Sequence, residues 1–333
     1  WAGQNVGLTR DMPAAYLVRT LAAETAVRLK AFSQEPPSMT SPRPRPVWRS
    51  MLFIPTTAEK FIEKAPTSGA DAIILDLEDA VAPNAKDSAR AALPGVAKRL
   101  ADQGLDVTVR INRPWRLAVK DIEAAVSESV VALLLPMTNT AAHVKEVDQV
   151  VSETEAEKGL PHGHTFFCPL IETAEGYLNA REIAHASPRT MSLSLGSEDF
   201  ALSMGMEAAP ETLYAPKQQI IACAREAGLT PMGFIGSIAE FRDIEKLQQI
   251  FTNSKRAGFQ MASCIHPNQV KVCNEIYGPS EAEIAQARKI VNAYDAALAA
   301  GQGAITVDGI MIDVPVADRS RALLAFADAL ANR

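Results

Sequence analysis

The chain has 333 residues, of which 47% are hydrophobic, and it carries 33 basic against 39 acidic side chains. This length and composition predict one large core with extensions at both ends, while the net charge of −6 argues against a nucleic-acid-binding surface. No apolar stretch approaches the roughly eighteen residues of a membrane span, and no charged start leads into a signal-peptide core. The four cysteines show no metal-binding spacing, so we expect reduced thiols in a cytoplasmic protein.

Residues 1–46 differ from the rest of the chain. Residues 13–32 have the spacing of a helix, with Leu17, Leu21 and Leu29 among its apolar positions. The segment SQEPPSMTSPRPRP that follows predicts an extended, proline-rich linker. We expect an arm that contacts another subunit. A targeting segment and a leader that is not native to the protein are the alternatives, and the acidic residues weigh against a mitochondrial presequence.

Eight short apolar runs, each bounded by turn or helix-start residues, predict strands. They lie in the segments 51–55, 72–76, 107–111, 131–136, 166–172, 191–199, 232–236 and 259–265. Helical patterns lie between them, for example at residues 59–65, 89–102, 141–159 and 217–228. Because almost wholly apolar strands are typical of parallel sheets buried on both faces, we predict a (β/α)8 TIM barrel. A doubly wound open sheet is the alternative.

The C-terminal segment continues past the eighth predicted strand. Residues 279–301 predict a long helix, with Ser280 as its N-cap, Glu283 three residues later and Gly301 as its stop. The segment AITVDGIMIDVPV and a helix over 316–330 then make a tail that is too long for another barrel unit. We therefore divide the chain into an N-terminal helix and linker (1–46), a TIM barrel (47–278) and a C-terminal helical extension that contributes to a neighbouring subunit (279–333).

Charged side chains follow the predicted strands, where the catalytic groups of a TIM barrel collect. Glu172 and Asp199 are the most informative pair, because two carboxylates at strand ends predict a site for Mg²⁺, which keeps water or substrate on its other positions. Either acid taken alone could instead be a helix N-cap. The other candidates at strand ends are Asp76, Glu78, Asp79, Arg110, Asn112, Ser197, Glu198 and His266. We expect His266 to fix a loop rather than to act as an acid or a metal ligand.

Acid-rich strand ends with one arginine predict a metal site that also holds an anion. A G-x-S-x-G nucleophile motif is missing, and no Cys or Ser has an obvious His partner, which disfavours nucleophilic hydrolysis. A glycine-rich phosphate loop of the P-loop or Rossmann kind is also missing.

Several segments together carry a resemblance to a known family. They are residues 49–65, 69–90, 109–112, 171–184, 195–200, 264–280 and 308–316, with LDLEDAV, IET and LGSEDF as the most specific set. The chain resembles the citrate lyase beta-subunit-like group of the HpcH/HpaI aldolase superfamily. The resemblance implies a Mg²⁺-dependent lyase or synthase, with Mn²⁺ as an alternative metal. Such an enzyme would act on a malyl-, citramalyl- or citryl-CoA-like thioester and release a short 2-oxo acid and an acyl-CoA.

The same resemblance implies roles for individual residues. Glu172 and Asp199 would bind the metal, with Glu172 also beside the substrate, and Arg110 would bind the substrate's carboxylate or its developing enolate oxygen. Asp313 from a neighbouring subunit of a homotrimer or hexamer would act as the catalytic acid or base. On the residues alone, capping of the following helix is the alternative for Asp313. Further catalytic or supporting residues around the metal would be Glu78, Asp79, Asp76, Asn112, Ser197 and Glu198.

Departures from the family pattern fall in loops that would hold a thioester or its nucleotide, for example at Thr56 and Met137. A polyanionic CoA would need local positive charge, and the candidate cations are Arg43, Arg45, Arg49, Lys60 and Lys217. Three alternatives to the CoA lyase therefore stay open. They are a metal-dependent aldolase acting on free 2-oxo acids, an acyl-CoA thioesterase, and a catalytically idle binding subunit.

Overall fold

A computed structural model describes residues 44–239 and 241–333, and the predictions for residues 1–43 lie outside this part of the chain. Eight parallel strands lie in the order β7-β6-β5-β4-β3-β2-β1-β8. Their bounds are β1 Ser50–Pro55, β2 Ala72–Asp76, β3 Asp106–Arg110, β4 Val130–Leu135, β5 Phe166–Ile171, β6 Ser192–Leu195, β7 Thr230–Met232 and β8 Ala262–Cys264. A parallel bridge between Met232 and Met261 joins the two ends of this order. The predicted TIM barrel is confirmed, and the open sheet is wrong.

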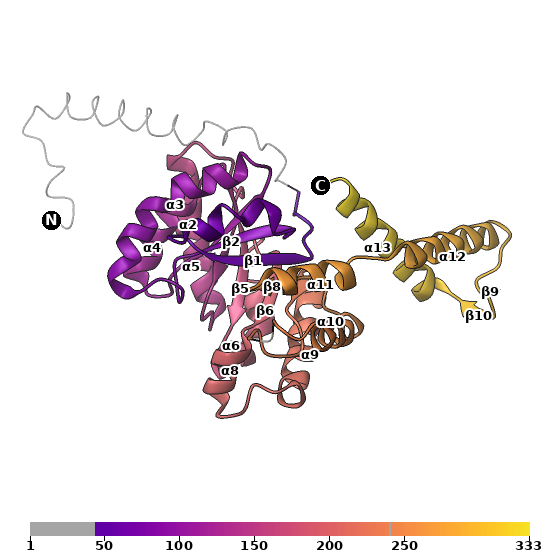
Figure 1. The fold of residues 1–333 in the computed structure, drawn as a ribbon. Helices are drawn as coiled ribbons and strands as arrows, with labels where there is room; N and C mark the ends of the chain where they lie inside the picture. Colours follow the sequence, from indigo (N-terminus) through magenta and orange to yellow (C-terminus); the bar gives the residue numbers. More distant parts are fainter. Residues whose placement is uncertain (1–43, 240) are drawn as a thin grey trace, which may run out of the picture. The chain divides into compact units, whose positions relative to one another are not determined.

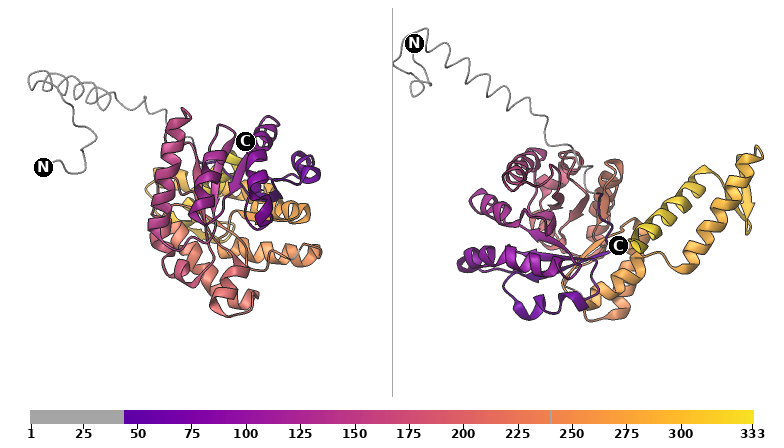
Figure 2. Two further views of the ribbon diagram at one scale, coloured as in Figure 1. Left: turned by 90° about the vertical axis from the view of Figure 1, so that its left-hand side faces the viewer. Right: turned by 90° about the horizontal axis from the view of Figure 1, so that it is seen from above.

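Helices follow the strands and surround them (Figures 1 and 2). Their bounds are α2 Glu59–Ile62, α3 Lys86–Ala101, α4 Trp115–Ala125, α5 Ala141–Glu157, α6 Ala174–Leu178, α7 Ala180–Ala184, α8 Ser197–Met204, α9 Pro210–Glu226, α10 Ile244–Ala257 and α11 Pro267–Tyr277. Every residue of β4 and β5 is buried, because helices cover the outside of the barrel and side chains fill its inside. Inside the barrel, Met51, Ile74, Leu134 and Met232 belong to one buried apolar cluster.

The last two barrel strands are shorter than predicted and displaced from the predicted segments. Strand β7 ends at Met232, whereas the sequence predicted residues 232–236. Gly233 has a φ of 139°, which turns the chain out of the sheet in a conformation that favours glycine. Strand β8 begins only at Ala262, after a bridge at Met261.

The C-terminal extension contains α12 Glu281–Ala299, β9 Ile305–Val307, β10 Ile310–Ile312 and α13 Val314–Ala331. Ser280 caps α12 as predicted, because its Oγ accepts from the Glu283 amide at 3.2 Å while Glu283 Oε2 accepts from the Ser280 amide at 2.7 Å. Strands β9 and β10 form an antiparallel hairpin that the sequence analysis missed. Its turn residues Asp308 and Gly309 have φ angles of 50° and 79°, which is the backbone that an Asp-Gly hairpin turn requires.

No helix in residues 44–239 and 241–333 combines the length and the apolar character that a membrane crossing needs.

A buried ion-pair network stabilises the amino-terminal side of β5 and β6. The Arg189 side chain is 2% exposed, and its guanidinium donates to Asp148 at 2.6 Å and to Glu155 at 2.7 Å. We expect Arg189→Met to lower the free energy of unfolding by about 3–5 kcal/mol, because it leaves a buried carboxylate without its partner. Urea denaturation measures the change. The control is Arg181→Met, which removes an exposed pair with Glu226 and should cost about 1 kcal/mol or less. Equal losses in both variants would contradict the prediction.

Candidate active site

A cavity of about 490 Å³ lies where the barrel strands end at their carboxyl side. It is bordered by the ends of β2, β3, β5 and β6 and by the segment after β7. Its charged lining residues are Asp76, Asp79, Arg110, Glu172, Glu198, Asp199 and Lys217. The cavity therefore gathers most of the predicted site residues, which are far apart in the sequence.

Glu172 lies directly after β5 and is 6% exposed. Its Oε2 accepts a hydrogen bond from the Met137 amide at 2.6 Å. A Cβ atom on Gly196 would lie 2.7 Å from both Cγ and Oε1 of Glu172, so only glycine lets the chain after β6 pass this close to the carboxylate. That passage brings Asp199, an exposed residue in the first turn of α8, to the same cavity.

Burial raises the pKa of Glu172 to about 7. The hydrogen bond from Met137 and the charge of Arg110 lower this pKa, whereas the charges of Asp199 and Asp79 raise it further. A buried carboxyl group that faces other carboxylates is stabilised in its charged form by a cation. The electrostatics of the cavity thus favour a bound positive charge.

Arg110, the last residue of β3, binds Asp76 at the end of β2 and two acids of the segment after it. Its Nε and Nη2 donate to the two Asp76 carboxylate oxygens at 2.7 and 2.6 Å, which is a bidentate pair. Its Nη1 lies 2.9 Å from Glu78 Oε2 and 3.0 Å from Asp79 Oδ2. The guanidinium also lies 4.9 Å from the centre of the Phe53 ring. These contacts account for four of the five guanidinium N–H groups, so Arg110 has little donor capacity left for a substrate carboxylate.

The segment that carries these acids is held from outside the cavity. Asn112 Nδ2 donates to the Leu77 carbonyl at 3.0 Å and to Asp121 Oδ2 at 2.6 Å. Lys86 Nζ donates to the carbonyls of Leu77 and Glu78 at 2.8 and 2.7 Å. Asn112 does not line the cavity, so it acts on the predicted site through the backbone of this segment. The supporting role of Lys86 was not predicted from the sequence.

Glu78 is not among the residues that line the cavity, but its pKa shifts in the same direction as that of Glu172. Burial raises the pKa of Glu78 to about 7, and the Arg110 charge opposes the shift while Asp79 adds to it. Asp79 is closer to solvent, with a 70% exposed side chain. The two neighbouring acids therefore differ in their exposure to solvent.

Lys217, in α9, is one of the candidate cations for CoA, and it lines the cavity. It is 2% exposed, a burial that the sequence analysis did not predict. Burial lowers its pKa to about 7, and the charge of Glu198 opposes the shift. The burial of Lys217 could have been predicted from the sequence, because the spacing of Leu213, Ile220 and Ile221 places it on the apolar face of its helix.

Two further cations proposed for CoA lie at the opposite end of the barrel. Arg49 precedes β1 and pairs with Asp71, which precedes β2. Arg45 donates to the carbonyls of Pro188 and Gly228, which precede β6 and β7. Neither residue borders the cavity. Of the remaining candidates, Lys60 is an exposed residue of α2, and Arg43 lies outside the described residues.

Ser197 and Glu198 form polar contacts with the segment after β7. Ser197 Oγ donates to the Gly236 carbonyl at 3.2 Å, and Glu198 Oε1 accepts from Ser237 Oγ at 2.6 Å. These bonds fix the first turn of α8, on which Asp199 also lies.

Asp313 and His266 both cap helices in this structure. Asp313 Oδ1 accepts from the Val316 amide at 3.4 Å at the start of α13, and Asp313 does not line the cavity of its own chain. His266 Nδ1 accepts from the Asn268 amide at 3.1 Å, and its ring stacks on Phe241 with centroids 4.9 Å apart. His266 therefore has the structural contacts that were expected of it.

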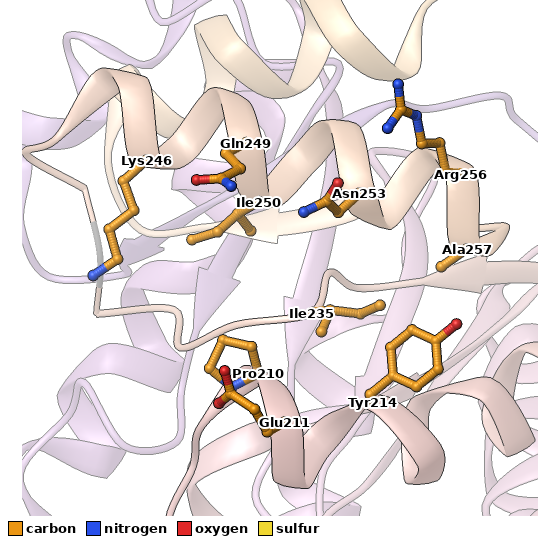
Figure 3. Close-up of a pocket in the computed structure, with 10 residues that line it drawn as sticks. All are labelled: Pro210, Glu211, Tyr214, Ile235, Lys246, Gln249, Ile250, Asn253, Arg256 and Ala257. Carbon is orange, nitrogen blue, oxygen red and sulfur yellow. The ribbon is translucent and has the colours of Figure 1, made fainter.

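A second hollow, of about 680 Å³, lies between α9 and α10 on the outside of the barrel (Figure 3). Figure 3 shows Gln249 and Asn253 on α10 facing Tyr214 and Glu211 on α9. Glu211 is the one carboxylate among its described lining residues, so this larger hollow lacks the paired acids of the barrel mouth.

The barrel-mouth cavity offers oxygen ligands to a hard divalent cation. Glu172 and Asp199 are its candidate pair. In residues 44–239 and 241–333, no group of three or more His, Cys, Asp or Glu side chains is arranged around a metal position. Two carboxylates with remaining positions for water or substrate suit Mg²⁺, which is held by few protein ligands in many enzyme sites. The residues present therefore fit the implied metal.

The fold and site together define a TIM barrel with an acidic mouth around one fixed arginine. Residues 49–267 match the family described as HpcH/HpaI aldolase/citrate lyase, and the chain belongs to this family. The citrate lyase subunit beta of Escherichia coli (strain K12) is 33% identical over 285 residues, covering 84% of this chain and 93% of that protein. The L-malyl-CoA/beta-methylmalyl-CoA lyase of Cereibacter sphaeroides (strain ATCC 17029 / ATH 2.4.9) is 34% identical over 289 residues, covering 80% of this chain and 90% of that protein.

Solved structures are similar over the same part of the chain. The protein CitE from Mycobacterium tuberculosis, in complex with magnesium, acetoacetate and coenzyme A, matches with a TM-score of 0.65 and 28% identity. The match covers 84% of this chain and 97% of that chain. A malate synthase from Haloferax volcanii is 17% identical with a TM-score of 0.63, and it shares the fold.

Proposed function

We propose that the protein is a Mg²⁺-dependent carbon–carbon lyase or synthase that acts on a 3-hydroxyacyl-CoA thioester. The substrate would be malyl-, citramalyl- or citryl-CoA-like, and the products a short 2-oxo acid and an acyl-CoA. The observation that carries the proposal is the cavity at the barrel mouth, where Glu172 and Asp199 meet beside Arg110. The similarity to a citrate lyase subunit and to a malyl-CoA lyase supports it.

Glu172 and Asp199 would hold the metal in this site. Bound there, Mg²⁺ supplies a Lewis acid that lowers the pKa of a substrate hydroxyl and polarises the neighbouring oxygens. Mn²⁺ suits the same oxygen ligands. Glu172 is presented in one orientation by the Met137 amide, which reduces the reorganisation that metal binding requires.

The remaining residues would place the substrate and move its proton. Cleavage removes the hydroxyl proton, breaks the bond between the carbinol carbon and the α-carbon of the thioester, and leaves the electron pair on the thioester as an enolate. An acid must then protonate the α-carbon to yield the acyl-CoA. Arg110, fixed by Asp76, would provide positive charge beside the reacting oxygens, and Asp76, Glu78 and Asp79 would order water around the metal.

Asp313 would supply that acid from a neighbouring subunit of a homo-oligomer. Two exposed apolar surfaces support such an assembly. On the β10 hairpin and the start of α13, Ile310, Met311 and Val314 are more than half exposed. On the helices that follow β5 and β6, Leu178 on α6 is 78% exposed and Leu202 on α8 is 81% exposed. Apolar side chains with this much exposure favour contact with a partner. The first group flanks Asp313 in the chain, and the second follows Glu172 and Asp199.

A mixing experiment tests the shared site. We expect Asp313→Asn and Glu172→Gln each to lose at least about a hundredfold in turnover, because one lacks the proton-transfer group and the other a metal ligand. Mixing the two variants under conditions that allow subunit exchange should restore part of the turnover, since some sites then combine two intact halves. Glu172→Gln mixed with itself is the control. Full turnover by Asp313→Asn alone, or no recovery after demonstrated exchange, would reject the shared site.

A substrate panel separates the proposed reaction from its alternatives. Malyl-CoA, β-methylmalyl-CoA, citramalyl-CoA, citryl-CoA and free 4-hydroxy-2-oxo acids would be incubated with Mg²⁺ and analysed by mass spectrometry. We expect a 2-oxo acid and an acyl-CoA from a thioester. Cleavage of free acids alone would favour the aldolase, and free CoA with an intact hydroxy acid would favour the thioesterase. No turnover would favour the idle binding subunit.

A further inference from the structure

Lys217 is a buried amino group with few protein partners, and an anion beside it would favour its charged form. It lies in α9 among buried apolar neighbours, one helical turn after Leu213, and it lines the barrel-mouth cavity. A lysine in such a place costs free energy, because its ammonium group leaves water. In the described part of the chain, no acidic side chain forms an ion pair with it that would offset this cost.

The two hydrogen bonds of Lys217 fix its position. Its Nζ donates to Ser197 Oγ at 2.8 Å and to the carbonyl of Phe234. The ammonium also lies 5.4 Å from the centre of the Phe234 ring. An ammonium group has three N–H donors, and the acceptors found among the described residues account for two. Because Lys217 borders the cavity, its third N–H is available to a ligand there.

The charges around the cavity favour an anion for this donor. Two cations line it within the described residues, and Arg110 already binds Asp76, Glu78 and Asp79. An anionic substrate that enters past these acids needs a positive group that is not already neutralised. Lys217 meets this need from the opposite side, since it contacts the segments after β6 and β7 while Arg110 ends β3.

We propose that Lys217 is a substrate-binding residue whose ammonium donates a hydrogen bond to a carboxylate oxygen of the 2-oxo acid. This inference rests on the proposed function and adds a specific recognition group to it. The acid would then lie between Arg110 and Lys217, with its carboxylate at the Lys217 side. A neutral thioester carbonyl would gain less from this ammonium than a carboxylate, because hydrogen bonds between two charged groups are stronger.

Pyruvate binding in the presence of Mg²⁺, measured by titration calorimetry, tests the proposal. We expect Lys217→Met and Lys217→Gln to weaken pyruvate binding by roughly ten- to a hundredfold, which corresponds to loss of one hydrogen bond between charged groups. Lys217→Gln keeps a donor for Ser197 or Phe234, so it decides the question if Lys217→Met does not fold. Lys98→Met, which removes a 70% exposed lysine from α3, is the matched control and should bind pyruvate like the wild type.

A second measurement separates binding from a structural role. Mn²⁺ affinity in the absence of pyruvate should change less than about twofold in both Lys217 variants, because the lysine does not contact Glu172 or Asp199. Unchanged pyruvate affinity in a folded variant would overturn the proposal. Loss of Mn²⁺ affinity together with pyruvate affinity would also overturn it. Lys217 would then be a structural residue that holds the segments after β6 and β7 together. If the wild type binds none of pyruvate, glyoxylate and oxaloacetate, the 2-oxo acids that the candidate thioesters would release, the proposed function itself fails.

Discussion

Glu172→Gln is expected to lower Mg²⁺-dependent turnover by roughly a thousandfold or more, the effect of several kcal/mol of lost transition-state stabilisation. The substitution keeps the size of the side chain, and its amide oxygen can still accept from the Met137 amide. It removes the negative charge that would bind the metal. The fold should survive, because a neutral side chain at this position also escapes the cost of burying a carboxylate next to Asp199 and Asp79.

Steady-state kinetics with the cleaved thioester checks this result. Glu175→Gln is the matched control, since Glu175 is an exposed acid in the first turn of α6, three residues further along the chain. It should keep wild-type turnover. If Glu172→Gln also kept wild-type turnover, with unchanged metal dependence, Glu172 would not be a metal ligand.

Arg110→Lys is expected to lower kcat/KM by about a hundredfold although it conserves the charge. Lysine is a point charge and cannot form the bidentate contact with Asp76 while also reaching Glu78 and Asp79. The segment after β2 would then lose its fixed position, and misplacement of about 1 Å in a site can cost this much. The lost hydrogen bonds should also lower the free energy of unfolding, by roughly 1–3 kcal/mol.

Kinetics and urea denaturation of the same variant check both parts. Arg189→Lys is the control, because it also weakens a buried arginine–carboxylate network but at the other end of the barrel. It should lose stability and keep kcat/KM. If the two variants lost kcat/KM equally, the effect of Arg110→Lys would come from general destabilisation and not from the site.

The sequence predicted the barrel because its strands are almost wholly apolar, and the strand ends then located most of the acids. Glu172 and Asp199 could be paired because parallel strands present their carboxyl ends at one face. The shortening of β7 could not be predicted, since it depends on the backbone angle that Gly233 adopts.

Side-chain partners were harder to predict than positions. Arg110 was predicted to bind the substrate, but its contacts with three acids were not predicted, because their direction depends on the turn after β2. Lys217 was named only as a candidate cation for CoA, and its burial was not predicted because its charge was weighed without the helix face on which it lies. The hairpin of β9 and β10 was missed although its Asp-Gly turn is a recognised signal, because the strands have only three residues each.

Titration of the protein with Mn²⁺, followed by electron paramagnetic resonance of the free ion, shows whether Glu172 and Asp199 form a metal site. We expect one ion per chain, displaced by Mg²⁺, and loss of this binding in both Glu172→Gln and Asp199→Asn. Binding that persists in both variants, or no specific binding to the wild type, would contradict a metal site at Glu172 and Asp199.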